Sequence, residues 1–394
     1  MSYSASPAAS DEVATYVANR IGFIELERSQ ALNALSVGMI RAMHAALDDW
    51  SDNPDVLAVV VRSQHPRAFC AGGDIRFLYE SARRGDEGAR DAFFIEEYRL
   101  NHAIFTYPKP YIALMNGIVM GGGMGISQGA HRTGGLRVVT QSTKMAMPET
   151  RIGLFPDVGA SWFLARTPGA IGRYFAVTGE TIGAADALYA GLADAYMEDA
   201  ALPALVDTLR SELFERGADV VACVERECRA YQVAPPPQES PLARARALID
   251  RHFALPDVPR ILASLSEKCD RDSADWAEQV IAVLRERSPL SMAVSLEVVT
   301  RAEGSMADVL RGDLDLTRSS FLNGDAVEGI RARIIDKDNA PRWRFARVED
   351  VSAADVAKMI ESPWPAGEHP LRDLRWSERT TSAGEALSPF LRLP

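Results

Sequence analysis

The chain has 394 residues, of which 47% are hydrophobic and 25% are charged, a composition typical of a globular protein with a large core. Its net charge of -11 argues against broad binding of nucleic acid or of anionic membranes. A phosphate-bearing ligand would therefore need local arginines, lysines and backbone N–H groups. We expect a small molecule as the partner, with no nucleic acid and no membrane.

Residues 1–18 show neither the apolar run of a signal peptide nor the arginine enrichment of a transit peptide, which predicts a disordered N-terminal tail. No apolar stretch approaches the roughly 20 residues that a membrane-spanning helix needs. Cys70, Cys223, Cys228 and Cys269 lack C-x-x-C spacing and the density of a secreted disulfide framework. Reduced thiols and a cytoplasmic location are the simplest interpretation.

Residues 19–229 alternate short β-like runs with helical patterns, which predicts an α/β core. The segment after Ser36 places its apolar residues on one helical stripe, with Ser36 as the N-cap. The β-like runs are IGFIEL from residue 21, VLAVVV from 56, PYIALM from 110 and LRVVTQ from 136.

The second half of the chain has a helical pattern. Residues 230–241 contain three consecutive prolines that cannot continue a helix, so we expect a linker there. Residues 242–361 predict a helical C-terminal lobe over the core. Residues 362–394 are rich in Pro, Arg and Gly and predict an arm or a disordered tail.

Two glycine clusters each follow a predicted strand and open a predicted helix. Gly72, Gly73 and Asp74 lie in AFCAGGDIRFL, and Gly121 to Gly123 lie in NGIVMGGGMGISQGA. The free N–H groups of two helix starts can together hold the oxyanion of a carbonyl that is attacked or enolised, and a thioester carbonyl would suit them. Each loop alone is equally explained by a tight turn with close helix packing.

Several other kinds of site are disfavoured. Neither glycine loop matches the phosphate pattern of ATP sites or the dinucleotide pattern of NAD sites. The six histidines are scattered without metal-ligand spacing, so we expect no metal. No G-x-S-x-G motif is present and Cys70 has no evident base in sequence, so Cys70 is interpreted as packed core.

Two carboxylates stand between turn-forming residues in the segment MAMPETRIGLFPDVGAS, residues 145–161. Glu149 follows a proline and Asp157 follows another, so the segment cannot run as one helix. Their apolar neighbours would raise a carboxyl pKa toward working pH, which suits acid/base chemistry. Alternatively, Glu149 caps the turn and Asp157 caps a helix that starts near Val158. The segment alone does not separate these interpretations.

Together these motifs resemble the crotonase (enoyl-CoA hydratase/isomerase) superfamily and, within it, the branch of the 3-hydroxyisobutyryl-CoA hydrolases. The similarity covers about residues 20–350 and includes EGIRARIIDKDNAPRW from residue 328, a region that simple hydratases lack. The resemblance implies an α/β fold, a crotonase-like spiral of ββα units with the helical C-terminal lobe. It also implies hydrolysis of a short 3-hydroxyacyl-CoA, 3-hydroxyisobutyryl-CoA in valine catabolism, with no cofactor because coenzyme A is part of the substrate.

The resemblance also assigns site residues. It places the thioester oxygen on the N–H groups of Gly73 and Gly122, an oxyanion hole. Glu149 corresponds to the main catalytic acid and Asp157 to its catalytic partner. Substrate binding is assigned to Glu97, Gly122, Glu149 and Asp157. The residues around Glu97, considered alone, favour a solvated position on a helix.

Other readings of the resemblance stay open. Hydratases of the superfamily carry a second catalytic Glu at the position of Gly125, so hydration is disfavoured here. A dienoyl-CoA isomerase remains a competitor, because that branch also places a Glu and an Asp in this loop, and a non-catalytic scaffold of the same fold is the third possibility. Arg28, Arg67 and Arg76 are candidates for contacting the phosphates of coenzyme A. The resemblance is also compatible with a homo-oligomer.

Overall fold

The structure is a computed structural model that describes residues 11–230, 240–267, 271–365 and 367–375. Its strands are β1 (Val13–Ala18), β2 (Ile21–Leu26), β3 (Ala58–Ser63), β4 (Ala68–Cys70), β5 (Tyr111–Met115), β6 (Ile118–Met120), β7 (Arg137–Val139), β8 (Lys144–Ala146) and β9 (Ala195–Tyr196). Its helices up to residue 230 are α1 (Val37–Ser51), α2 (Ile75–Arg84), α3 (Glu87–Phe105), α4 (Gly122–Gln128), α5 (Ala160–Leu164), α6 (Ile171–Thr178), α7 (Ala184–Tyr189), α8 (Leu202–Ser211) and α9 (Gly217–Ala230). The later helices are α10 (Pro241–Phe253), α11 (Val258–Leu265), α12 (Arg271–Arg285), α13 (Pro289–Thr300), α14 (Met306–Leu322), α15 (Ala326–Ile330) and α16 (Ala353–Ile360).

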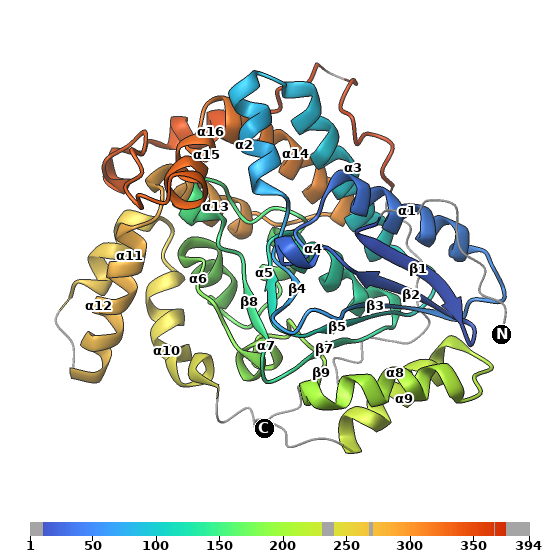
Figure 1. Cartoon of the computed structure of the whole chain (residues 1–394). Helices are drawn as coiled ribbons and strands as arrows, with labels where there is room; N and C mark the ends of the chain where they lie inside the picture. The colour runs from blue at the N-terminus through green and yellow to red at the C-terminus, as the bar shows by residue number, and fades with distance from the viewer. Residues whose placement is uncertain (1–10, 231–239, 268–270, 366, 376–394) are drawn as a thin grey trace.

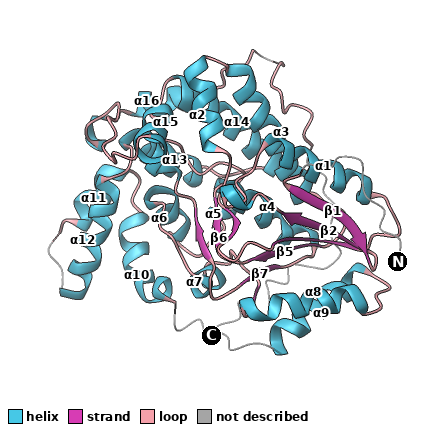
Figure 2. Cartoon of the chain, in the orientation of Figure 1, coloured by secondary structure: helices cyan, strands magenta, loops and turns pink. Residues whose placement is uncertain are grey.

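The strands form two sheets that helices surround (Figures 1 and 2). The larger sheet has the order β1-β2-β3-β5-β7-β9, and the smaller has the order β4-β6-β8. β1 pairs antiparallel with β2, whereas the later neighbours in the larger sheet are parallel. From β3 onward, consecutive strands alternate between the two sheets before the chain enters a helix. This repeated ββα course is the expected spiral.

Both faces of the larger sheet are buried, which explains its continuous apolar strands. In β3, Val59 and Val61 point into the main core with α1 and α3, whereas Ala58 and Val60 face a second core. Apolar side chains of α8 and α9 close that second core, and Figure 1 shows these two helices along the lower side of the sheet. The fading β pattern after residue 202 therefore marks helices that cover the sheet.

Two expected helix starts are confirmed. The Ser36 hydroxyl accepts a hydrogen bond from the Met39 N–H at 3.1 Å and begins α1. The Asp74 carboxylate accepts from the Phe77 N–H at 3.1 Å and begins α2, directly after Gly72 and Gly73.

The helices after residue 240 are packed into the rest of the molecule. The main core joins side chains of α6 with those of α10, α13 and α14. The Arg287 Nε donates a hydrogen bond to the Thr178 carbonyl at 2.7 Å, and the Tyr98 hydroxyl lies 2.8 Å from the Thr317 hydroxyl. The C-terminal lobe is thus continuous with the α/β core.

The structure corrects one boundary at the N-terminus. Val13 to Ala18, which the sequence placed in a disordered tail, form β1, because their register against β2 completes the edge of the sheet. Residues 1–10, most of the expected linker (231–239), Cys269 and residues 376–394 lie outside the described residues. The described part of the C-terminal segment folds back as an arm, with Leu371 fully buried and Arg99 paired with Asp373. Among the described residues, no helix is long and apolar enough to cross a membrane.

Candidate active site

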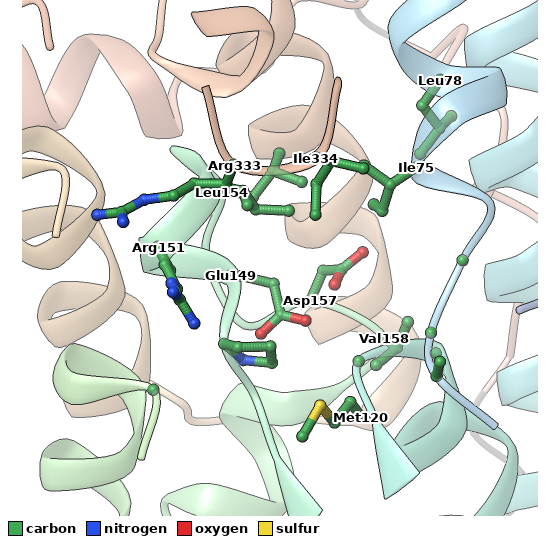
Figure 3. Close-up of a pocket in the computed structure, with 18 of the residues that line it drawn as sticks. Ile75, Leu78, Met120, Glu149, Arg151, Leu154, Asp157, Val158, Arg333 and Ile334 are labelled. Carbon is green, nitrogen blue, oxygen red and sulfur yellow. The ribbon is translucent and has the colours of Figure 1, made fainter. Parts of the chain in front are cut away.

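The sequence-predicted site residues surround one cavity of about 480 Å³. Gly73, Gly122, Glu97, Glu149 and Asp157 all line it. Apolar side chains complete the walls, and Figure 3 shows Leu154 and Ile334 on one side of the two acids and Met120 and Val158 on the other. The cavity therefore combines an apolar lining with a few convergent polar groups, as small-molecule sites do.

The two glycine loops meet at this cavity. A Cβ atom added to Gly122 would lie only 3.3 Å from the Gly73 nitrogen, so the two N–H groups are neighbours. Within the described chain, neither N–H donates a hydrogen bond to the protein, and that of Gly122 stands at the open start of α4. Gly121 needs its positive φ of 48° to make the turn into α4. The loops thus offer two adjacent donors to one acceptor.

Two buried carboxyl groups lie beside these donors. Glu149 is 7% exposed, and its Oε1 would lie 2.8 Å from a Cβ on Gly121. Glu97 is 2% exposed, and its Oε1 would overlap a Cβ on Gly122. Glu97 Oε1 and Glu149 Oε2 are buried and have no hydrogen-bond partner in the described protein. Glu97 is therefore a cavity residue, and the solvated position that its local sequence favours is wrong.

The carboxyl groups perturb one another. Burial, followed by the negative charge of Asp157, raises the pKa of Glu149 well above its ordinary value. The same two causes, in the same order, raise the pKa of Glu97. Burial raises the pKa of Asp157 to about 6, although the Tyr98 hydroxyl and its own backbone N–H oppose the rise. Near neutral pH, Asp157 therefore carries the negative charge and the two glutamates tend to hold protons.

Asp157 is positioned by residues that the sequence did not single out. The Tyr98 hydroxyl donates to Asp157 Oδ2 at 2.7 Å and lies 2.8 Å from the Thr317 hydroxyl on α14. Asp313, also on α14, accepts from the Gly159 N–H at 2.8 Å. The C-terminal lobe thus holds the turn that presents Asp157. No local sequence pattern marks these contacts, because the partners are far apart along the chain.

The turn after Asp157 does not begin a helix capped by that residue. Val158 has a φ of 54°, a conformation that a β-branched residue rarely adopts, and Gly159 is the residue before α5. Glu149 likewise makes no capping bond; it opens the 3₁₀ turn η3 (Glu149–Ile152) with its carboxyl in the cavity. The alternative capping interpretation of both acids is therefore wrong.

The position of the hydratase family's second glutamate is closed here. A Cβ on Gly125 would lie 2.8 Å from the Val158 Cβ and 2.9 Å from the Asn101 Nδ2. A longer side chain would have to displace both neighbours. Cys70 is fully buried, and burial raises the pKa of its thiol to about 12, so it is packed core as expected.

Basic residues also line the cavity, at positions that the sequence did not suggest. Arg151 follows Glu149 in η3, Arg287 precedes α13, and Arg333 lies on the single π-helical turn η6 (Arg331–Ile335). η6 belongs to the EGIRARIIDKD segment. None of the three arginines suggested for the phosphates is in the lining: Arg28 pairs with Glu12 and Asp74, and Arg67 and Arg76 are exposed.

The family model described as enoyl-CoA hydratase/isomerase matches residues 21–360. The chain belongs to this family. A curated relative from Gallus gallus named 3-hydroxyisobutyryl-CoA hydrolase, mitochondrial, is 36% identical and aligns over 89% of this chain and 88% of its own length. The Xenopus tropicalis protein of the same name is 38% identical over 84% of each chain, and one from Arabidopsis thaliana named probable 3-hydroxyisobutyryl-CoA hydrolase 3 is 34% identical over 86% and 89%.

Solved structures support the same fold. A structure titled carnitinyl-CoA dehydratase, from Mycobacterium thermoresistibile, is 36% identical, with a TM-score of 0.80 over 92% of this chain and 98% of its own. One titled enoyl-CoA hydratase, from Rhodobacter sphaeroides, is also 36% identical, with a TM-score of 0.78 over 89% and 98%. The crotonase fold expected from the sequence is confirmed. The names of these relatives divide between hydrolase and hydratase or dehydratase, and the geometry of the site distinguishes these reactions.

Proposed function

We propose that the protein hydrolyses a short 3-hydroxyacyl-CoA thioester, 3-hydroxyisobutyryl-CoA in particular, to the hydroxy acid and coenzyme A. The observation that carries the proposal is the placement of Glu149 and Asp157 beside two free N–H groups with a closed position at Gly125. Curated relatives named for this hydrolase, aligned over most of the chain, support the same reaction. The chemistry uses no further cofactor, because coenzyme A enters with the substrate.

In the proposed reaction, the thioester oxygen accepts hydrogen bonds from Gly73 and Gly122. These donors stabilise the negative charge that the oxygen gains when the carbonyl is attacked. The carbon–sulfur bond then breaks and the thiolate of coenzyme A leaves with the bonding electrons. The attacking group is water that gives its proton to Glu149, or Glu149 itself, through a mixed anhydride that water later opens.

Label found in Glu149 after single-turnover hydrolysis in ¹⁸O-water identifies the mixed-anhydride route, whereas label only in the acid is compatible with direct water attack and with an anhydride opened at the acyl carbonyl. Water attack puts the label only into the released acid. A mixed anhydride that water opens at the Glu149 carbonyl leaves the label in that side chain, where peptide mass spectrometry detects it.

Both routes need the ionised form of Glu149. Because burial and Asp157 raise the pKa of Glu149, the active fraction increases as pH rises through that pKa. We therefore expect kcat to increase from acidic toward alkaline pH.

Glu97 and Asp157 are the groups proposed to recognise the substrate hydroxyl. Glu97 Oε1 is buried and unpartnered, so a hydroxyl that reaches it satisfies a polar atom that is otherwise left without a hydrogen bond. A site of this kind discriminates against the analogue that lacks the hydroxyl.

The test of the proposed function is release of coenzyme A, followed with a thiol reagent, from 3-hydroxyisobutyryl-CoA and from isobutyryl-CoA. We expect kcat/KM to favour the hydroxylated substrate by about tenfold or more. Glu97→Ala should reduce that ratio, whereas Glu96→Ala, whose carboxylate pairs with Arg41 outside the cavity, should leave it unchanged. Equal rates in the wild type would mean a general short-chain thioesterase. Rapid hydration of crotonyl-CoA without thiol release would replace the proposal by a hydratase, a chromophore shift without thiol would indicate an isomerase, and no turnover would indicate a scaffold.

We also propose a cytoplasmic protein that can form a homo-oligomer. Cys70, Cys223 and Cys228 are unpaired thiols, which suits a reducing compartment. Cell fractionation and light scattering test the two statements.

A further inference from the structure

One end of the cavity gathers three guanidinium groups. Arg151, Arg287 and Arg333 all line it, although they come from three separate segments of the chain. Figure 3 shows Arg151 and Arg333 to one side of Glu149 and Asp157, opposite Ile75 and Leu78. Two cavity ends of different chemistry therefore flank the catalytic acids.

The three arginines are close enough to repel one another. The pKa of Arg287 is lowered first by burial and next by the positive charge of Arg151, and the same two causes lower the pKa of Arg333. Glu286 partly offsets this charge from the solvent side, at 3.7 Å from Arg287 and 3.6 Å from Arg333.

The cluster leaves donors unused within the described protein. The side chain of Arg151 makes no hydrogen bond or ion pair with any described residue. The side chain of Arg333 is 8% exposed. Its Nη1 donates to Asn339 Oδ1 at 3.1 Å and its Nη2 to the Glu286 carbonyl at 3.3 Å, whereas its Nε is buried without a hydrogen-bond partner in that same part of the chain. A purely structural cluster would pair these groups, since a buried guanidinium N–H without an acceptor is unfavourable.

We propose that Arg151, Arg287 and Arg333 form an anion-binding subsite that holds a second, negatively charged oxygen group of the thioester substrate. The subsite deepens the proposed function, on which it rests, by adding an anionic group to the description of the substrate. A phosphate of coenzyme A and a carboxylate at the far end of the acyl group share this chemistry. Guanidinium groups suit both, because their planar N–H pairs match the oxygens of either anion.

The geometry gives each arginine a part. Arg287 is held by the bond from its Nε to the Thr178 carbonyl and by the nearby Glu286 carboxylate at Nη1, which leaves its Nη2 without a hydrogen-bond partner among the described residues. Arg333, whose Nη groups are bonded to Asn339 and Glu286, contributes positive charge from the wall, and Arg151 is the exposed member of the cluster. Because Arg151 lies two residues after Glu149 and both line the same cavity, one substrate molecule can contact both groups.

The experiment compares Arg151→Met, Arg333→Met and the double variant with the wild type on paired thioesters. One pair is 3-hydroxyisobutyryl-CoA and 3-hydroxyisobutyryl-pantetheine, which lacks every phosphate. The other pair is succinyl-CoA and butyryl-CoA, which differ by a terminal carboxylate. Arg83→Met, an exposed change on α2 outside the cavity, is the control.

We expect each single variant to lower kcat/KM by about tenfold for the charged member of one pair and by less than about twofold for its partner. A selective loss of kcat/KM for the coenzyme A thioester of the first pair identifies a phosphate as the bound anion. A selective loss for succinyl-CoA in the second pair identifies a carboxylate. The effect should weaken as ionic strength rises. Equal losses within both pairs, or no loss, would overturn the subsite. Unchanged melting temperature keeps a folding defect from being mistaken for either result, and Arg151→Met is the informative variant if Arg333→Met unfolds.

Calorimetric titration separates this inference from the proposed function. Coenzyme A and succinyl-CoA are titrated into the Glu149→Gln protein with and without Arg151→Met. A loss of affinity for either ligand supports the subsite even if the wild type hydrolyses no thioester. Unchanged affinity for both ligands contradicts the subsite even if hydrolysis is rapid.

Discussion

The two ends of the cavity differ in how far the sequence predicts them. The glycine and carboxylate end comes from short motifs in the α/β core, where Gly73, Gly122, Glu149 and Asp157 each lie in a local pattern. The arginine end is assembled from Arg151, Arg287 and Arg333; two of these lie in segments that carry the family resemblance, but none was singled out as a site residue. The reacting groups depend on particular backbone conformations, which a local sequence motif can reveal. The arginine end requires only that three segments of the chain meet, which a local motif need not reveal.

The largest expected effect tests the motif-derived end. Glu149→Gln keeps the side-chain volume and removes the base or nucleophile, so we expect kcat for thioester hydrolysis to fall by about 10² to 10⁴. Steady-state kinetics measure the fall, and circular dichroism checks the fold. Near wild-type kcat in this variant would remove Glu149 from the mechanism.

The oxyanion donors give the second largest effect. Gly122→Pro removes one N–H at the first residue of α4, a position where proline suits a helix. We expect kcat to fall by about 10² to 10³. The matched control is Gly122→Ala, which adds the same Cβ against Glu97 and keeps the N–H. If the two variants lose equal activity, crowding and not the missing donor is responsible.

The hydrogen bond from Tyr98 on α3 to Asp157 should have a smaller effect. Tyr98→Phe deletes the hydrogen bond that opposes the rise in the Asp157 pKa, so that pKa should increase above about 6. Because ionised Asp157 is proposed to accept the substrate hydroxyl, the acidic limb of kcat/KM that reports Asp157 should move to higher pH, with a loss of about fivefold near neutrality. Thr317→Val, which leaves the tyrosine hydroxyl free to bind Asp157, is the control. An unshifted limb would mean that Asp157 does not need the tyrosine.

The smallest effect concerns stability. The pKa of Glu97 is raised in the folded protein by burial and by Asp157, so the unfolded chain loses this proton at lower pH than the folded protein does. Below the pKa of Glu97 in the unfolded chain, this residue therefore does not lower the free energy of unfolding. As pH rises above that pKa, Glu97 lowers the free energy of unfolding.

Glu97→Gln removes that penalty, and we expect its melting temperature to exceed that of the wild type by on the order of 2 °C at pH 8, with a smaller difference at pH 5. Glu80→Gln, an exposed change on α2, is the control. A difference that is larger at pH 5 would contradict the assigned direction.

Much of the fold followed from periodicity. The apolar runs became β2, β3, β5 and β7, because strands buried on both faces have no polar side, and Ser36 and Asp74 marked helix starts by their side-chain acceptors. β1 was missed, because its buried side is short and its remaining residues are partly exposed.

Site residues were harder to predict where they depend on distant partners. Glu97 seemed solvated, since its helix carries charges on several sides, and only the packing of α3 against the glycine loops buries it. Asp313 bonds Gly159 and Thr317 bonds Tyr98, pairs that lie 154 and 219 positions apart along the chain. Contacts at that separation have no spacing rule that a sequence could display.

The lining of the cavity runs from Ala71 to Ile334, which has a consequence for synthesis of the protein. A ribosome releases the chain from its N-terminus, so domains generally begin to fold from that side. A nascent chain that has not yet exposed residue 334 already contains both glycine loops and both acids but lacks the wall from η6. Such a chain cannot enclose the thioester. The complete cavity therefore exists only when translation has passed η6, and a chain terminated earlier lacks part of its wall even where its sheet is formed.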